Sequence, residues 1–185
     1  GTWRDRLQWY RNTGTRTSPS FTMADTALVT ITRGNHSVPS FGDLDGDGLP
    51  DLVIGEASGT INLYHNTGSK SAPRFTLVSD QFQDIKVGRR SAPVLVDMDG
   101  DGRLDMLIGT GEGVLQLWRG VRGNAGAGMA SVRFERDIAF NVRSYSDAVP
   151  AVGDLHGTGR LDLLVGTTAG GLRWFERAQS PTSRE

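Results

Sequence analysis

Short apolar segments that end in glycine recur three times along this chain. Because successive residues of a strand point to opposite faces of a sheet, three consecutive apolar residues indicate a strand that is buried on both faces. The short length and the flanking glycines favour a strand over a helix. The segments are 52–55 (Leu-Val-Ile-Gly), 106–109 (Met-Leu-Ile-Gly) and 163–166 (Leu-Leu-Val-Gly).

Pairs of large apolar residues form a second recurring feature. Since both residues of a pair are apolar, each pair predicts a further strand covered on both faces, as in a propeller blade packed between two others. The pairs are Trp9-Tyr10, Leu63-Tyr64, Leu117-Trp118 and Trp174-Phe175. Successive pairs are 54, 54 and 57 residues apart. We expect the three added residues in a flexible Gly/Ala-rich loop within 121–131.

The repeat predicts the fold class. A period of this length with about four short strands per unit is typical of an all-β chain, a β-propeller of four-stranded antiparallel blades. The strand order begins and ends within a blade, so we expect about three blades in an incomplete ring. The predicted single segment, 1–185, divides into units at approximately 1–32 (third and fourth strands), 33–88, 89–144 and 145–178 (first three strands), with a polar tail at 179–185.

Two Asp/Gly-rich segments lie between the first and second strands of the complete units. Segments 43–51 and 97–105 each carry aspartate at positions 1, 3, 5 and 9, and glycine at positions 4 and 6. Four carboxylates this close repel one another unless a cation lies among them, and the glycines let the backbone fold around it. Ca2+ tolerates about six to eight oxygens in loose geometry, so we expect Ca2+ before Mg2+. The alternative is a polar turn without metal.

The predicted ligands follow from these positions. We expect side-chain ligands at positions 1, 3, 5 and 9, with the ninth aspartate bidentate because it closes the loop, and a backbone carbonyl at position 7. The loops are not EF-hands, since position 12 is apolar, Ile54 or Ile108. The predicted ligands are Asp43, Asp45, Asp47, Leu49 and Asp51 in the first loop, and Asp97, Asp99, Asp101, Arg103 and Asp105 in the second.

A third segment, 154–162, follows the same pattern with half the charge. His156 and Thr158 replace the carboxylates at positions 3 and 5. This loop is therefore a weaker candidate for Ca2+ than the other two. Its candidate ligands are Asp154, His156, Thr158, Arg160 and Asp162.

The stretch Val38–Gly68 combines the first loop with Phe41-Gly42 before it and Ile54-Gly55 after it. This combination resembles the FG-GAP repeat family, also called the integrin-alpha-like β-propeller repeat. The resemblance implies an extracellular, calcium-stabilised propeller that serves adhesion or ligand binding and not catalysis. The third unit departs from it, with Val152-Gly153 in place of Phe-Gly.

Composition and charge narrow the functional classes. The net charge is −1 and no basic stripe points to nucleic acid. There is no apolar run long enough to span a membrane. Cysteine is absent, which excludes disulfides and thiol chemistry but not secretion.

The three histidines, His36, His65 and His156, occupy different phases of the repeat, and no nucleophile elbow or P-loop is present. No catalytic residue is predicted.

Three functional hypotheses remain. We favour an extracellular or cell-surface calcium-binding module for adhesion, ligand binding or scaffolding, with a protein or glycan ligand and with further blades supplied by a second copy or another chain. The second is a carbohydrate-binding propeller, with the aromatic pairs as sugar platforms, although blade core is the simpler interpretation of those pairs. The third is a structural subunit or a fragment of a larger secreted assembly. Trp3, outside the repeated pattern, is a candidate surface contact.

Overall fold

The computed structural model describes residues 6–31, 35–123 and 128–175; Trp3 and the polar tail at 179–185 lie outside these ranges. Apart from two short 3-10 turns, η1 (Phe82–Asp84) and η2 (Met129–Ser131), its regular elements are strands. The strands are β1 (Trp9–Asn12), β2 (Phe21–Asp25), β3 (Val38–Gly42), β4 (Asp51–Gly55), β5 (Ile61–Asn66), β6 (Phe75–Ser79), β7 (Ala92–Val96), β8 (Asp105–Gly109), β9 (Val114–Arg122), β10 (Val132–Arg143), β11 (Val149–Gly153), β12 (Asp162–Gly166) and β13 (Leu172–Phe175).

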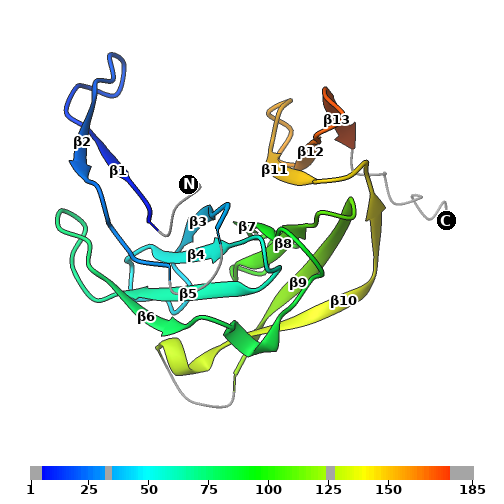
Figure 1. Cartoon of the computed structure of the whole chain (residues 1–185), viewed down its shortest axis with the longest axis horizontal. Coiled ribbons are helices and arrows are strands. Elements are labelled where there is room, and N and C mark those ends of the chain that lie inside the picture. The colour runs from blue at the N-terminus through cyan, green and yellow to red at the C-terminus, as the bar shows by residue number, and fades with distance from the viewer. Residues whose placement is uncertain (1–5, 32–34, 124–127, 176–185) are drawn as a thin grey trace, which may run out of the picture.

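The strands form four antiparallel sheets in chain order. Two complete blades, β3-β4-β5-β6 and β7-β8-β9-β10, lie between a two-stranded sheet, β1-β2, and a three-stranded sheet, β11-β12-β13. The first strands of successive sheets, β3, β7 and β11, pack beside one another. The sheets follow an arc that is open between the β1-β2 hairpin and the β11–β13 sheet (Figure 1). The chain is therefore an all-β propeller segment of about three blades without a closed ring.

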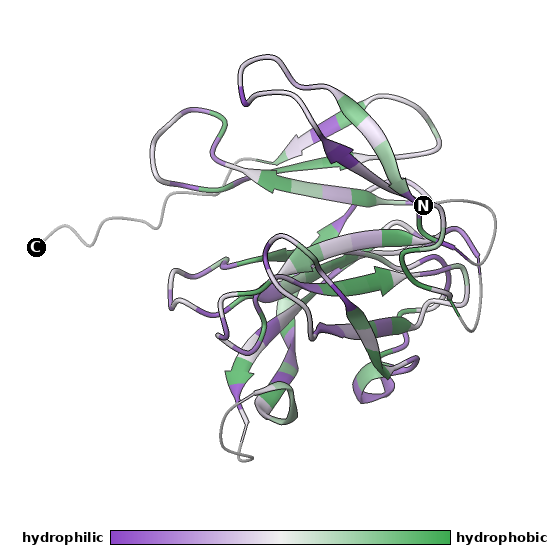
Figure 2. Ribbon diagram, turned by 90° about the vertical axis from the view of Figure 1, so that its left-hand side faces the viewer, coloured by the Kyte–Doolittle hydropathy of each residue, from purple (hydrophilic) through white to green (hydrophobic). Residues whose placement is uncertain are grey.

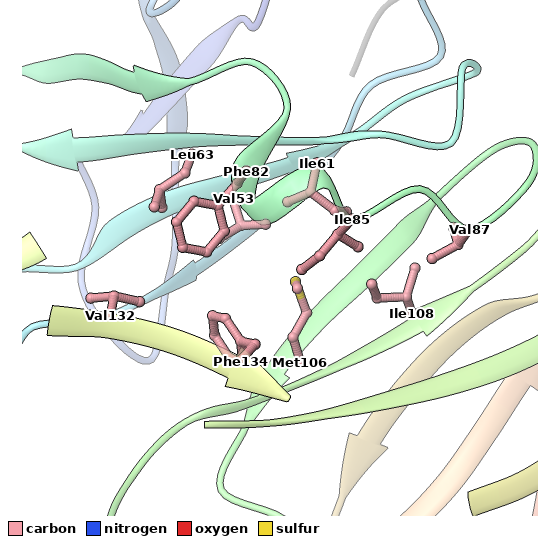
Figure 3. Packing of buried hydrophobic residues seen from close by; sticks show 10 residues of the cluster. All are labelled: Val53, Ile61, Leu63, Phe82, Ile85, Val87, Met106, Ile108, Val132 and Phe134. Carbon is pink, nitrogen blue, oxygen red and sulfur yellow. The ribbon is translucent and has the colours of Figure 1, made fainter. Parts of the chain in front are cut away.

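The hydrophobic core is divided into layers between neighbouring sheets. One layer joins the two complete blades and includes Leu63 and Phe82 from one, with Met106 and Phe134 from the other (Figure 3). The rings of Phe82 and Phe134 meet edge to face, with centroids 6.3 Å apart. Two further layers lie on the outer sides of the complete blades. Hydrophobic residues follow the central strands, whereas hydrophilic residues concentrate in the loops (Figure 2).

The second strands are the most deeply buried elements. Every residue of β4 and β8 is buried, which confirms the strands predicted from the glycine-bounded apolar segments. The apolar pair of β5, Leu63 and Tyr64, is also buried on both faces. Burial of both faces is wrong for the terminal sheets, where Tyr10 is exposed and Trp174 is 51% exposed. Among the described residues, each terminal sheet has a neighbouring blade on one face only.

Part of the Gly/Ala-rich segment 121–131, which was predicted to be a flexible loop, belongs to regular elements. Strand β9 continues to Arg122, where it pairs with Val132 of β10, and η2 follows at Met129. The paired ends of β9 and β10 therefore absorb part of the segment that was expected to be flexible.

Candidate metal centres

The three Asp/Gly segments connect the first and second strands of their sheets. Segments 43–51, 97–105 and 154–162 lie between β3 and β4, β7 and β8, and β11 and β12. Glycines at positions 4 and 6 all have positive φ, for example 80° at Gly46 and 85° at Gly48. An added Cβ at these two glycines would meet no atom within 4 Å, so the requirement for glycine is conformational and not steric.

The first aspartate of each loop organises the backbone around it. Asp43 accepts hydrogen bonds from the amides of Gly46, at 2.8 Å, and Gly48, at 2.9 Å. Asp97 accepts the same pair from Gly100 and Gly102, at 2.7 and 2.9 Å. The Gly102 amide and its neighbours lower the pKa of Asp97, because they favour the ionised carboxylate.

The carboxylates at positions 1, 3 and 5 come together in both complete loops. In each of the sets Asp43, Asp45, Asp47 and Asp97, Asp99, Asp101, one oxygen per residue lies within 4.8 Å of the others. Oxygens on opposite sides of a Ca2+ ion are separated by about twice its 2.3–2.6 Å bond length, so this spacing fits a shared cation. Burial, with repulsion from Asp51 and Asp47, raises the pKa of Asp45. A cation among these oxygens would relieve that repulsion.

The ninth aspartate joins each loop to the strands beside it. Asp51 is fully buried, and its Oδ2 accepts the amide of Leu44 at 3.1 Å. Its Oδ1 accepts the amide of Asn66, in β5, at 3.0 Å. Asp105 and Asp162 accept the corresponding loop amides, from Met98 and Leu155. The ninth carboxylate thus has a structural role in all three loops; its bidentate metal ligation stays a prediction.

The seventh residue of each loop was predicted to supply a carbonyl ligand. The amides of Leu49 and Arg103 donate to the fifth-position carboxylates Asp47 and Asp101, at 2.7 and 2.8 Å. In the third loop, the Arg160 amide donates to the Thr158 hydroxyl at 3.4 Å. These bonds fix the backbone at position 7, and ligation by its carbonyl stays a prediction.

Sequence reasoning missed His65 as a member of the first site. Its Nδ1 lies 3.0 Å from Asp51 Oδ1 and 3.9 Å from Asp45 Oδ2. These three side chains form a further group in which a cation could be shared. The contact depends on the β4–β5 register, which puts the residue after the apolar pair of β5 beside the end of the loop, and the sequence pattern alone does not give that register.

Arg119 takes the position of His65 in the second complete blade. Its Nη1 lies 3.0 Å from Asp105 Oδ2 and 3.4 Å from Asp99 Oδ2, and its Nε lies 3.3 Å from Asp137 Oδ2. A second guanidinium, that of Arg103, contacts Asp101. The two loops therefore carry carboxylates at the same positions, but an imidazole lies beside the first loop and a guanidinium beside the second.

The third loop has the same backbone frame and a different side-chain set. Asp154 accepts the amides of Thr158 and Gly159, at 3.0 and 2.7 Å, and these bonds lower its pKa. His156 Nδ1 lies 3.2 Å from Asp162 Oδ2, and the Trp174 indole donates to Asp162 Oδ1 at 3.3 Å. Within the described ranges, no group of three metal-ligating side chains forms in this loop.

A cavity lies at the opposite end of the blades from these loops. Its volume is about 370 Å³, and Ala92, Ala148 and Val149 are among its lining residues. His36, Arg90 and Asp147 occupy the equivalent position of three successive units, all with φ between 53° and 57°. Arg90 Nη1 lies 2.6 Å from Asp147 Oδ1, and Thr168 donates to Asp147 Oδ2 at 3.1 Å. Non-glycine residues in this left-handed conformation are strained, and such strain often accompanies binding sites.

The repeats of this chain match a known protein family. A model described as an FG-GAP-like repeat matches residues 1–54, 43–108 and 97–165. The chain belongs to this family. The second and third matches begin at the first aspartate of a loop and end in the buried strand after the next loop, so each FG-GAP match bridges two blades.

No solved structure matches this FG-GAP repeat chain. In the part of the chain that the structure describes, no helix has the length and apolarity needed to cross a bilayer.

Proposed function

We propose that this chain is a calcium-binding propeller module that acts outside the cell or at its surface in adhesion, ligand binding or scaffolding. Its role is binding and not catalysis. Calcium in the loops at 43–51 and 97–105 stabilises the blades, and the chain binds a protein or glycan partner. Further blades, from a second copy or from another chain, cover the terminal sheets.

One observation carries the calcium part of this proposal. Three carboxylates, at positions 1, 3 and 5, converge to within 4.8 Å in both complete loops, and a fourth, at position 9, is anchored beside them. All are hard oxygen donors, which suit Ca2+ better than a transition metal. Extracellular calcium modules bind with Kd values of about 10⁻⁴–10⁻³ M, so the sites would fill at extracellular calcium concentrations.

The topology supports a proposed position for the partner surface. The metal loops occupy one end of the blades, and the connections that carry His36, Arg90 and Asp147 occupy the other. Binding proteins commonly present variable loops on a rigid scaffold. We therefore propose that calcium fixes the scaffold at one end and that the opposite end contacts the partner.

A calcium titration by calorimetry tests the central part of this proposal. The unsubstituted chain should bind two Ca2+ ions. Asp47→Ala should remove the first site and Asp101→Ala the second, because each loses one of three converging carboxylates. The control, His156→Ala in the third loop, should leave the stoichiometry at two. A chain that binds no calcium, or an Asp47→Ala variant that keeps two sites, would contradict the proposal.

A further inference from the structure

His65 and Arg119 are equivalent residues of the two complete blades. Each follows the large apolar pair of its strand, β5 or β9, and each lies 3.0 Å from the ninth aspartate of its own loop. An imidazole can offer a nitrogen lone pair, whereas a guanidinium is permanently charged and has no acceptor. The two loops therefore meet chemically different side chains at the same point.

The second loop already contains cationic groups. Arg119 contacts two of its four carboxylates, Asp99 and Asp105, and Arg103 contacts a third, Asp101. In the first loop, His65 lies beside Asp45 and Asp51, and Leu49 occupies the position equivalent to Arg103. A divalent ion that enters the second loop must approach a fixed positive charge or displace it, and either costs affinity.

We infer that Arg119 sets the calcium affinity of the second loop below that of the first, so that the two sites fill in order. This inference rests on the proposed calcium function. Arg119 has an alternative partner when a cation takes Asp99, because its Nε already lies 3.3 Å from Asp137 in β10. Displacement would therefore leave the guanidinium paired, and the second loop would fill reversibly at higher calcium concentration.

The filling order can be measured in the unsubstituted chain. The amides of Gly48 and Gly102 donate to the first aspartates of their respective loops, so their NMR signals report each loop separately. During a calcium titration, the Gly48 signal should shift at a concentration about tenfold lower than the Gly102 signal. Simultaneous shifts, or an earlier shift of Gly102, would overturn the inference while leaving the calcium function intact. A titration in which neither signal moves would contradict the calcium function itself.

Substitutions then assign the difference to the charge. With the first loop disabled by Asp47→Ala, Arg119→Gln should raise the affinity of the second loop about tenfold, whereas the matched control Arg119→Lys should leave it low because it keeps the charge. With the second loop disabled by Asp101→Ala, His65→Arg should lower the affinity of the first loop. An Arg119→Gln variant that binds calcium as weakly as Arg119→Lys would overturn the assignment, with circular dichroism confirming that each variant is folded.

Discussion

At the scale of single residues, Glu56 shows how one unit differs from the next. It is fully buried directly after β4, and its Oε1 accepts the Thr60 hydroxyl at 2.5 Å. Its Oε2 has no hydrogen-bond partner among the described residues. The next unit has Thr110 and Val114 at these positions, with the Val114 amide donating to the Thr110 hydroxyl at 3.1 Å.

This difference predicts that substitutions of Thr60 and Glu56 have non-additive effects on the free energy of unfolding. Thr60→Val removes the partner of a buried carboxylate, and should lower the free energy of unfolding by about 1–3 kcal/mol. Adding Glu56→Thr removes the carboxylate as well, and should recover most of that loss. Urea denaturation of the two variants measures both effects. A Thr60→Val chain as stable as the original would show that this hydrogen bond contributes nothing.

The loop carboxylates were predictable from the sequence, whereas their neighbours were not. The spacing of aspartate and glycine is local, so it places Asp43, Asp45 and Asp47 together without knowledge of the fold. The contacts of His65 and Arg119 depend on the register of a strand that returns about 14 residues later. Their equal phase in the repeat shows that the two residues are equivalent, but it does not place either of them beside a loop.

At the scale of elements, glycine at the ends of β4 and β8 permits the close approach of the next blade. A Cβ at Gly55 would lie 2.2 Å from the Ser91 carbonyl oxygen, and one at Gly109 would lie 2.1 Å from that of Ala148. The Ser91 amide also donates to the Glu56 carbonyl at 3.0 Å across the same joint. At Gly166, in the terminal sheet, the nearest atom would be 3.8 Å away.

Alanine at these equivalent glycines should therefore lower the free energy of unfolding by different amounts. Gly109→Ala should lower the free energy of unfolding by about 1–3 kcal/mol, because backbone atoms must move to admit the methyl group. Gly166→Ala, the matched control, should change it by no more than about 0.5 kcal/mol. Thermal or chemical denaturation compares the two variants. Equal losses at both positions would show that the cost comes from strand conformation and not from the joint between blades.

Most of the strands were predictable, because their apolar positions repeat with the blade. The ends of β9 and β10 were not, since their composition favours a loop while their backbone pairing continues the ladder. Gly120 explains part of this conflict. A Cβ there would lie 2.3 Å from the Leu104 carbonyl oxygen, so glycine is required inside this strand by a close backbone contact.

At the scale of the whole molecule, the terminal sheets leave apolar side chains exposed. Tyr10, Phe21 and Met23 are exposed on the β1-β2 sheet, and Leu172 and Trp174 on the β11–β13 sheet. Exposed apolar surface at both ends of an arc favours association through those ends. We expect the chain alone to associate head to tail at micromolar concentration, as measured by sedimentation velocity. A soluble monomer with a cooperative melt would contradict this expectation.

Thermal unfolding with and without calcium tests the central claim most directly. With Kd values of about 10⁻⁴–10⁻³ M, millimolar calcium should add about 0.4–1.4 kcal/mol of stability per site. Two sites should then raise the Tm by about 2–11 °C relative to the chain in a chelator. The variant Asp47→Ala/Asp101→Ala should lose this shift. A Tm that is the same in chelator and in millimolar calcium would contradict the account of a calcium-stabilised propeller.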